Sequence, residues 1–165
     1  GPLLDLNGRV IGVNTAILSD TRSGSGIGFA IPSNQVRRVV PYLMAEGRYV
    51  HSWLGISGAS ILPEMRQSMN LTNDVRGVMV ASVSNNGPAA RAGLAGATSA
   101  VTTPFGNLPL GGDIITAING TPITQMSDLI SFLETSTRPG DTVSMSVLRQ
   151  GQLFNISVTL IERPQ

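Results

Sequence analysis

The pattern of apolar and polar residues divides the chain into short strands, turn-rich connections and two amphipathic helices. Apolar residues alternate with polar ones over 143–147 and again over 154–160, as expected for half-buried strands. Over 36–44 the apolar residues instead recur at helical spacing and form one stripe. The pattern predicts a mainly β chain with added helices, the α+β class.

The first fifty residues are predicted to form a β-hairpin, a short strand and a helix. The hairpin turns at Asn7-Gly8, a pair that strongly favours a tight turn between strands. Ser33 is expected to cap the helix, Pro41 to kink or split it, and Gly47 to end it.

From Trp53 onward the pattern predicts a second unit with about five strands and two main helices. Pro88 suits the first position of a short helix, and Ser127 suits the cap of a longer one. Residues 95–110 are rich in Gly and Thr and are expected to form a loop. The expected strands cover residues 54–61, 78–83, 113–118, 143–147 and 154–160.

Composition narrows the possible functions. The net charge of +1 gives no electrostatic basis for binding nucleic acid or an anionic membrane. The chain has no cysteine, which excludes disulfides and thiolate metal sites, and its one histidine, His51, excludes sites that need two. The uncharged stretch 92–112 contains too many Gly, Thr and Pro residues for a membrane span.

Neither a cofactor nor a metal is predicted. The spacing of Gly24, Gly26 and Gly28 is similar to that of a phosphate-binding loop. No helix follows directly and no lysine is placed to bind phosphate, so a nucleotide site is not predicted here.

A candidate binding motif opens the second unit at Trp53-Leu54-Gly55-Ile56. A glycine between two apolar residues lets the backbone turn tightly and leaves its amides free to face a ligand. Such a triplet is common at the start of a buried strand, so its weight comes from the motifs that follow it.

These motifs together resemble a PDZ domain of the bacterial type. The resemblance is carried by Leu54-Gly55-Ile56, Asn86–Leu94, Gly112–Ile115 and Ile118-Asn119-Gly120, in that order. The first fifty residues are similar to the end of a trypsin-like protease domain of the HtrA/Deg family, on Gly1–Asp5, Asn7-Gly8, Val10–Asn14 and Gly26–Pro32. The resemblance implies the last strands and linker helix of a β-barrel over 1–50 and a PDZ domain over 51–165.

The same resemblance implies that this chain alone is not a protease. In the HtrA/Deg family the nucleophilic serine lies in Gly-Asn-Ser-Gly-Gly-Pro, which would place it just before Gly1. His51 follows the barrel segment and cannot correspond to the catalytic histidine, so the arrangement needed to activate a serine is absent. Ile27, Gly28 and Phe29, with Gly1, would be remnants of the substrate pocket.

An incomplete barrel leaves strand edges and apolar faces uncovered. Residues 1–32 are therefore expected to be mobile, swapped with a neighbouring molecule, or paired with polypeptide outside this sequence.

For the second unit, the resemblance implies a peptide groove. Amides around Leu54, Gly55 and Ile56, next to Trp53, would bind a peptide's C-terminal carboxylate, and the strand that follows would pair with the peptide. The helix after Ser127 would form the opposite wall. The implied groove residues are Ser57, Gly58, Ala59, Met126, Ile130 and Leu133.

Several of these positions have simpler interpretations. Ile56 and Leu133 are also suited to the core, and Trp53 to packing at the junction of the two units. His51 fits a solvated linker residue as well as a pH sensor. Two helix faces are open for the groove. One carries Met126, Ile130 and Leu133, and the other carries Leu129, Phe132 and Leu133.

The resemblance implies the C-terminal part of an HtrA/Deg-like serine endopeptidase. Its PDZ groove would bind C-terminal or extended segments of unfolded proteins and recruit substrate or regulate the protease half. The implied partners are the peptide, the missing protease half and other copies of the chain, as trimers in that family. A stand-alone scaffold module and a PDZ domain used for oligomer assembly are the alternatives. The parent would be periplasmic, extracytoplasmic or membrane-anchored, with membrane contact only through an N-terminal segment outside this sequence.

Overall fold

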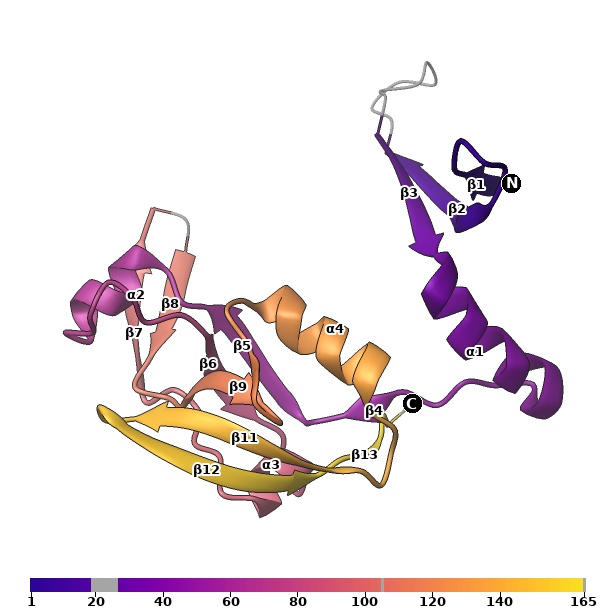
Figure 1. The fold of residues 1–165 in the computed structure, drawn as a ribbon. Helices are drawn as coiled ribbons and strands as arrows, with labels where there is room; N and C mark the ends of the chain where they lie inside the picture. Colours follow the sequence, from indigo (N-terminus) through magenta and orange to yellow (C-terminus); the bar gives the residue numbers. More distant parts are fainter. Residues whose placement is uncertain (19–26, 105, 165) are drawn as a thin grey trace. The chain divides into compact units, whose positions relative to one another are not determined.

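The computed structural model describes residues 1–18, 27–104 and 106–164. The chain forms two compact units, Gly1–Tyr49 (unit 1) and Val50–Gln165 (unit 2). Both contain antiparallel strands and at least one helix, so the α+β class predicted from the sequence is confirmed (Figure 1).

Unit 1 is a three-stranded antiparallel sheet followed by one helix. Strands β1 (Pro2–Leu4) and β2 (Val10–Leu18) form the predicted hairpin, and β3 (Ile27–Pro32) pairs with β2. The Asp5 carboxylate accepts hydrogen bonds from the N–H groups of Asn7 and Arg9, at 2.9 and 2.8 Å, which holds the turn.

Helix α1 (Ser33–Glu46) corrects the prediction about where it begins. Pro32, with ψ of 142°, provides the extended backbone of the cap, so Ser33 is already helical and caps nothing. Pro41 lies inside the helix, which is not split there, and a kink at this residue stays a prediction. The predicted stop is confirmed, because Gly47 adopts φ of +70° and donates its N–H to the Leu43 carbonyl.

Unit 1 buries little of its apolar surface. No residue of α1 is buried in the structure. The exposed large apolar side chains of the strands and their turn include Leu3, Leu4, Leu6, Val10, Ile11, Val13, Ile17, Ile27, Phe29 and Ile31.

Unit 2 is built on a six-stranded antiparallel sheet. Its order is β12 (Gln152–Thr159), β11 (Thr142–Arg149), β9 (Ile114–Ile118), β6 (Val78–Val83) and β5 (Ile56–Ser60), with β10 (Thr121–Pro122) paired to β9. Each predicted strand of this unit is present. Asn119-Gly120 and Gln150-Gly151 have positive φ at both positions, the geometry of tight hairpin turns. Among the described residues, strands β5 and β12 form the two edges of this sheet.

Three helices accompany the sheet: α2 (Pro63–Ser68), α3 (Pro88–Arg91) and α4 (Met126–Ser136). Pro63 and Pro88 occupy the first helical turn, where a missing N–H costs nothing. The predicted cap of α4 is corrected: Gln125 is the N-cap, and the Asp128 carboxylate accepts its backbone N–H at 3.2 Å. Within the described ranges, no helix has the length and apolar character of a membrane span.

Residues 95–110 correct another prediction. They contain a hairpin of β7 (Ser99–Thr103) and β8 (Gly106–Leu110) where a loop was expected. Thr, Ser and Val favour extended backbone, and Leu108 and Leu110 pack against a small apolar cluster of unit 2. That cluster comprises Ile61, Met65, Met79 and Ile114.

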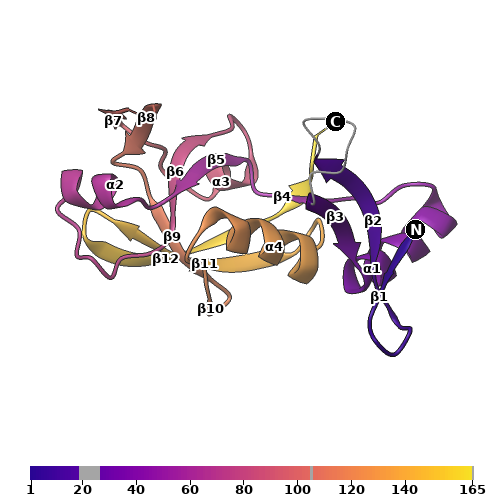
Figure 2. The same cartoon turned by 90° about the horizontal axis from the view of Figure 1, so that it is seen from above.

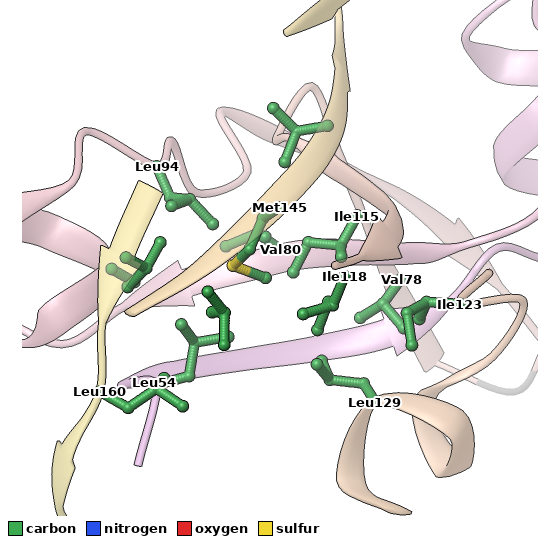
Figure 3. Packing of buried hydrophobic residues seen from close by; sticks show 14 residues of the cluster. Leu54, Val78, Val80, Leu94, Ile115, Ile118, Ile123, Leu129, Met145 and Leu160 are labelled. Atoms are coloured by element: carbon green, nitrogen blue, oxygen red, sulfur yellow. The ribbon is translucent and has the colours of Figure 1, made fainter. Parts of the chain in front are cut away.

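The main core of unit 2 lies between the sheet and α4 (Figure 3). Leu129 of α4 points toward Ile118 and Ile123, and all three are at most 1% exposed. At the other side of the core, Leu54 lies next to Leu160. The two-residue strands β4 (Ser52–Trp53) and β13 (Ile161–Glu162) pair beside this point. The core thus fixes both α4 and the segment that leads into β5.

Candidate functional site

A groove of about 270 Å³ lies between the start of β5 and helix α4. Because β5 is an edge strand, its side facing away from β6 is not covered by another strand of the sheet. The groove is lined by Ser52, Trp53, Leu54, Gly55, Ile56, Met126, Leu129, Ile130, Leu133, Glu134 and Arg163.

Two hydrogen bonds hold α4 along the groove. At the first turn of the helix, the Met126 N–H donates to the Ser60 hydroxyl at the end of β5, at 2.9 Å. At the last turns, Glu134 bonds to His51, which directly precedes β4, at 2.8 Å. The helix therefore runs with its C-terminal end toward the beginning of β5 (Figures 1 and 2).

The segment between β4 and β5 presents unused backbone donors to this region. The Leu54 carbonyl accepts the Ala89 N–H at 3.0 Å, and the Gly55 carbonyl accepts the Ser84 N–H at 2.8 Å. Both carbonyls are thus tied to the body of unit 2. The N–H groups of Leu54 and Gly55 donate to no other residue in the described part of the chain, and so remain available.

Gly55 is required by both backbone conformation and space. Its φ of +79° is unfavourable for other residues, and a Cβ there would lie 3.2 Å from Cη2 of Trp53. The Trp53 ring therefore packs directly against the glycine, close to Pro88. Trp53 therefore supports Gly55 and also lines the groove, while its suggested packing at the junction of the two units stays a prediction.

The helix face toward the groove is apolar. Met126, Ile130 and Leu133 line it, and Ile130 is 51% exposed. Leu129 also reaches the lining but is 1% exposed and belongs to the core, against which Phe132 packs as well. Of the two helix faces that the sequence left open, the one with Met126, Ile130 and Leu133 lies toward the groove.

The predicted residues Ser57, Gly58 and Ala59 lie on β5 but are not among the residues that line the groove. The Ser57 hydroxyl bonds to that of Ser82, at 2.7 Å. At Gly58 a Cβ would lie 2.7 Å from the Met79 carbonyl oxygen, so this glycine allows β6 to approach. Their predicted role is through the backbone of the strand, and it stays a prediction.

Charged residues gather at the end of the groove nearest Gly55. The His51 Nδ1 lies 2.8 Å from a Glu134 carboxylate oxygen, and the His51 carbonyl accepts the Arg163 N–H at 3.0 Å. His51 is therefore not simply a solvated linker residue. Sequence reasoning missed Ser52, Glu134 and Arg163, because none of them belongs to a local motif and His51 lies 83 residues before Glu134.

In unit 1, Gly28 and Phe29 line an open hollow of about 660 Å³ over the sheet. Gly1 and Ile27 are not part of its lining; the Gly1 carbonyl accepts the Asn14 N–H at 3.1 Å. Most of the candidate phosphate loop, Gly24 to Gly26, lies outside the described residues. As far as the structure describes unit 1, the lining of this hollow is mainly apolar, and Asn14 and Thr15 are its polar members.

The fold and the groove define a domain of the PDZ class, and comparison with known proteins agrees. The PDZ domain family matches residues 55–160, so the chain belongs to that family. It is 34% identical over 99% of its length to a probable periplasmic serine endoprotease, DegP-like, of Brucella suis. It is also 42% identical to Protease Do-like 1, chloroplastic, of Arabidopsis thaliana, and 38% identical to the periplasmic pH-dependent serine endoprotease DegQ of Escherichia coli, over 99% and 97% of its length.

Solved structures of HtrA-type proteases have the same fold. The HtrA-type protease AlgW with a tripeptide matches the whole chain with a TM-score of 0.76 at 34% identity, and the chain covers 49% of it. The same protease with a decapeptide gives a TM-score of 0.75. The chain spans 29%, 35% and 31% of the Brucella, Arabidopsis and Escherichia relatives. Over its whole length the chain is thus similar to part of these HtrA-type and Deg-type proteases.

Proposed function

We propose that unit 2 binds peptides in the groove between β5 and α4. The peptide would add to β5 as a further antiparallel strand, with its C-terminal carboxylate at the amides of Leu54 and Gly55. The observation that carries this proposal is the pair of undonated N–H groups at the start of an edge strand. Strand addition uses backbone groups and therefore accepts many sequences.

Side-chain selectivity would come from the apolar wall. Ile56, Ile130 and Leu133 line the groove and are not fully buried, so they are available to a ligand. Burying an apolar peptide side chain among them would contribute about 1.5–3 kcal/mol. The favoured peptides would then end in an apolar residue.

In a longer protein, the groove would recruit unfolded substrates to a protease half or regulate that half. This proposal rests on the HtrA-type relatives, whose names describe serine endoproteases. The uncovered apolar face of unit 1 fits a segment completed by further polypeptide. Two of the named relatives are periplasmic proteins, which supports an extracytoplasmic site of action, and a trimer is the assembly expected from the family resemblance.

This chain itself would bind peptides without cleaving them. The sequence contains no Gly-Asn-Ser-Gly motif, and its one histidine lies in unit 2, bonded to Glu134. Incubation of the chain with unfolded casein should therefore leave the casein intact. Cleavage that persists in a His51→Ala variant would point to a contaminating protease, whereas cleavage lost in that variant would contradict the proposal.

The binding proposal is tested with a library of C-terminal decapeptides and the same peptides amidated. Free-carboxylate peptides with an apolar last residue should bind, and amidation should weaken them by about tenfold or more, since a charge-assisted hydrogen bond contributes about 1.5–3 kcal/mol. Ile130→Ala should weaken binding by about three- to tenfold through lost apolar contact. Leu153→Ala, at a 71% exposed position on the opposite edge strand, is the matched control and should bind normally.

Other outcomes separate the alternatives. Equal binding of free and amidated peptides would contradict carboxylate capture and indicate recognition of internal segments. Failure of every peptide, together with a size that grows with protein concentration, would favour an assembly role for unit 2.

A further inference from the structure

A histidine and a glutamate are hydrogen-bonded to each other beside the groove. His51, the single histidine of the chain, bonds through Nδ1 to the Glu134 carboxylate at 2.8 Å. The two side chains are 45% and 29% exposed, so protons reach them freely. An unperturbed histidine changes charge between pH 5 and 8, while a glutamate remains ionised there.

This pair lies at the position where the proposed ligand is most negatively charged. Glu134 lines the same groove of about 270 Å³ as Leu54 and Gly55, whose amides would receive the peptide carboxylate. Glu134 is also in the last turns of α4, and the C-terminal end of a helix carries partial negative charge. A peptide carboxylate bound at these amides would share the groove with Glu134, and unscreened charges in one small groove interact.

We propose that protonation of His51 controls the affinity of the groove for peptides with a free C-terminal carboxylate. This inference rests on the proposed peptide-binding function and adds its regulation. With His51 protonated, the charge of Glu134 is balanced and the carboxylate binds. With His51 neutral, Glu134 is an unbalanced anion and repels the carboxylate.

The other charged residues next to His51 do not reverse this dependence. Arg163, which lines the groove, and Arg48, three positions before His51, stay charged at any relevant pH. Glu162 of β13 is ionised throughout the same range. They set a constant background, against which the charge of the His51–Glu134 pair is the proposed variable.

The proposal predicts the direction in which peptide affinity changes with pH, and it also predicts how bound peptide affects His51. Affinity for free-carboxylate peptides should fall by about three- to tenfold between pH 5.5 and pH 8, as expected for one partly solvated charge pair. By linkage, adding peptide must favour protonated His51 to the same extent. Amidated peptides lack the charge and should show no such dependence.

The experiment uses the full chain and the free-carboxylate decapeptide that binds best in the library, with its amidated form. Affinities are measured at pH 5.5 and pH 8 for the unchanged chain, His51→Gln and Glu134→Gln. Both variants should lose the pH dependence, and Glu134→Gln should bind at pH 8 at least as tightly as the unchanged chain. Glu64→Gln, in the first turn of α2 and outside the groove lining, is the matched control and should keep the dependence.

A second readout follows the ring resonances of His51 by NMR, which are unambiguous because the chain has no other histidine. Their titration midpoint should move upward when the decapeptide is added, and not when its amide is added. Binding that is independent of pH, or a dependence that survives in Glu134→Gln, would overturn this inference and leave peptide binding intact. If no library peptide binds at either pH, the proposed function itself fails, and this inference with it.

Discussion

Asp113 and Arg149 form a bidentate ion pair at the edge of the unit 2 core. The guanidinium donates from Nε to one carboxylate oxygen at 2.6 Å and from Nη2 to the other at 2.7 Å. Asp113 is fully buried, and its carboxylate also accepts the Ala95 N–H at 2.9 Å. Arg149 additionally donates to the Gly93 carbonyl at 2.7 Å, so the pair joins β9 and β11 to the segment after α3.

The first prediction concerns this pair. Hydrogen bonding to Asp113 raises the pKa of Arg149, which therefore stays charged throughout the pH range of folding. Arg149→Ala leaves a buried carboxylate without its counter-charge and should lower the free energy of unfolding by about 2 kcal/mol. This is less than the roughly 3–5 kcal/mol typical of fully buried pairs, because the Arg149 side chain is 36% exposed and water can partly replace it.

Urea unfolding of the purified chain measures this change. Arg91→Ala, at an exposed position at the end of α3, is the matched control and should change the free energy by less than about 0.5 kcal/mol. Equal stability of the Arg149 and Arg91 variants would show that the ion pair contributes nothing.

The second prediction separates two requirements at Gly55. A Cβ at this position meets an unfavourable φ of +79° and also the Trp53 ring at 3.2 Å. Gly120 has nearly the same φ, +78°, but a Cβ added at this position would have no neighbouring heavy atom within 4 Å. Gly120→Ala should therefore cost only the backbone term of about 1–2 kcal/mol. Gly55→Ala should cost more, and should also reduce peptide affinity by about tenfold by moving the Leu54 and Gly55 amides.

Thermal unfolding and decapeptide titration of both variants provide the comparison. Unchanged peptide binding in Gly55→Ala would mean that this segment does not position the carboxylate.

Local features of the fold were predictable from the sequence, and contacts between distant segments were not. The Asn119-Gly120 turn and the Gly47 helix end were predictable because a few adjacent residues determine their conformation. The β7–β8 hairpin was missed because Thr102 and Thr103 place polar residues on both faces of β7, and because β8 contains Gly106 and Pro109, residue types that are uncommon inside strands.

The groove shows the same limit. Its apolar wall followed from helical spacing together with the family resemblance. Choosing between the two helix faces required the groove lining, which includes Met126, Ile130 and Leu133 but not Phe132. The His51–Glu134 pair joins residues 83 positions apart, and the Asp113–Arg149 pair joins residues 36 apart. Such pairs depend on strand order and helix placement, for which a single sequence contains no local signal.

The third prediction is a pH dependence of stability that arises at the start of α4. The pKa of Asp128 is lowered from its ordinary 3.8, first by the Thr124 hydroxyl at 2.6 Å and then by the Thr124 N–H at 2.9 Å. A carboxylate with a lowered folded-state pKa stabilises the protein above its ordinary pKa, and this contribution disappears as the pH falls through the lowered value.

Asp128→Asn should therefore lower the Tm at pH 7, and its Tm should converge with that of the unchanged chain near pH 2. Thr124→Val keeps the carboxylate and removes its strongest donor, so its acid destabilisation should begin at a higher pH. Circular dichroism melting curves from pH 7 to pH 2 test both variants. A constant difference in Tm between Asp128→Asn and the unchanged chain across this range would contradict the assignment.

The last prediction concerns the stability of unit 1. Its strands expose apolar side chains on both sides of the hairpin, and α1 buries none of its residues, so little burial opposes the entropy of unfolding. In a dilute solution of this chain, amides of β2 and β3 should exchange with solvent at least about a hundredfold faster than those of β6 and β9, which a difference of about 2.7 kcal/mol in opening free energy would produce. Hydrogen exchange measured at two protein concentrations distinguishes the possible causes of any protection. Protection that increases with concentration would indicate that unit 1 pairs with another copy, whereas strong protection of β2 and β3 in the dilute monomer would show that this sheet is stable alone.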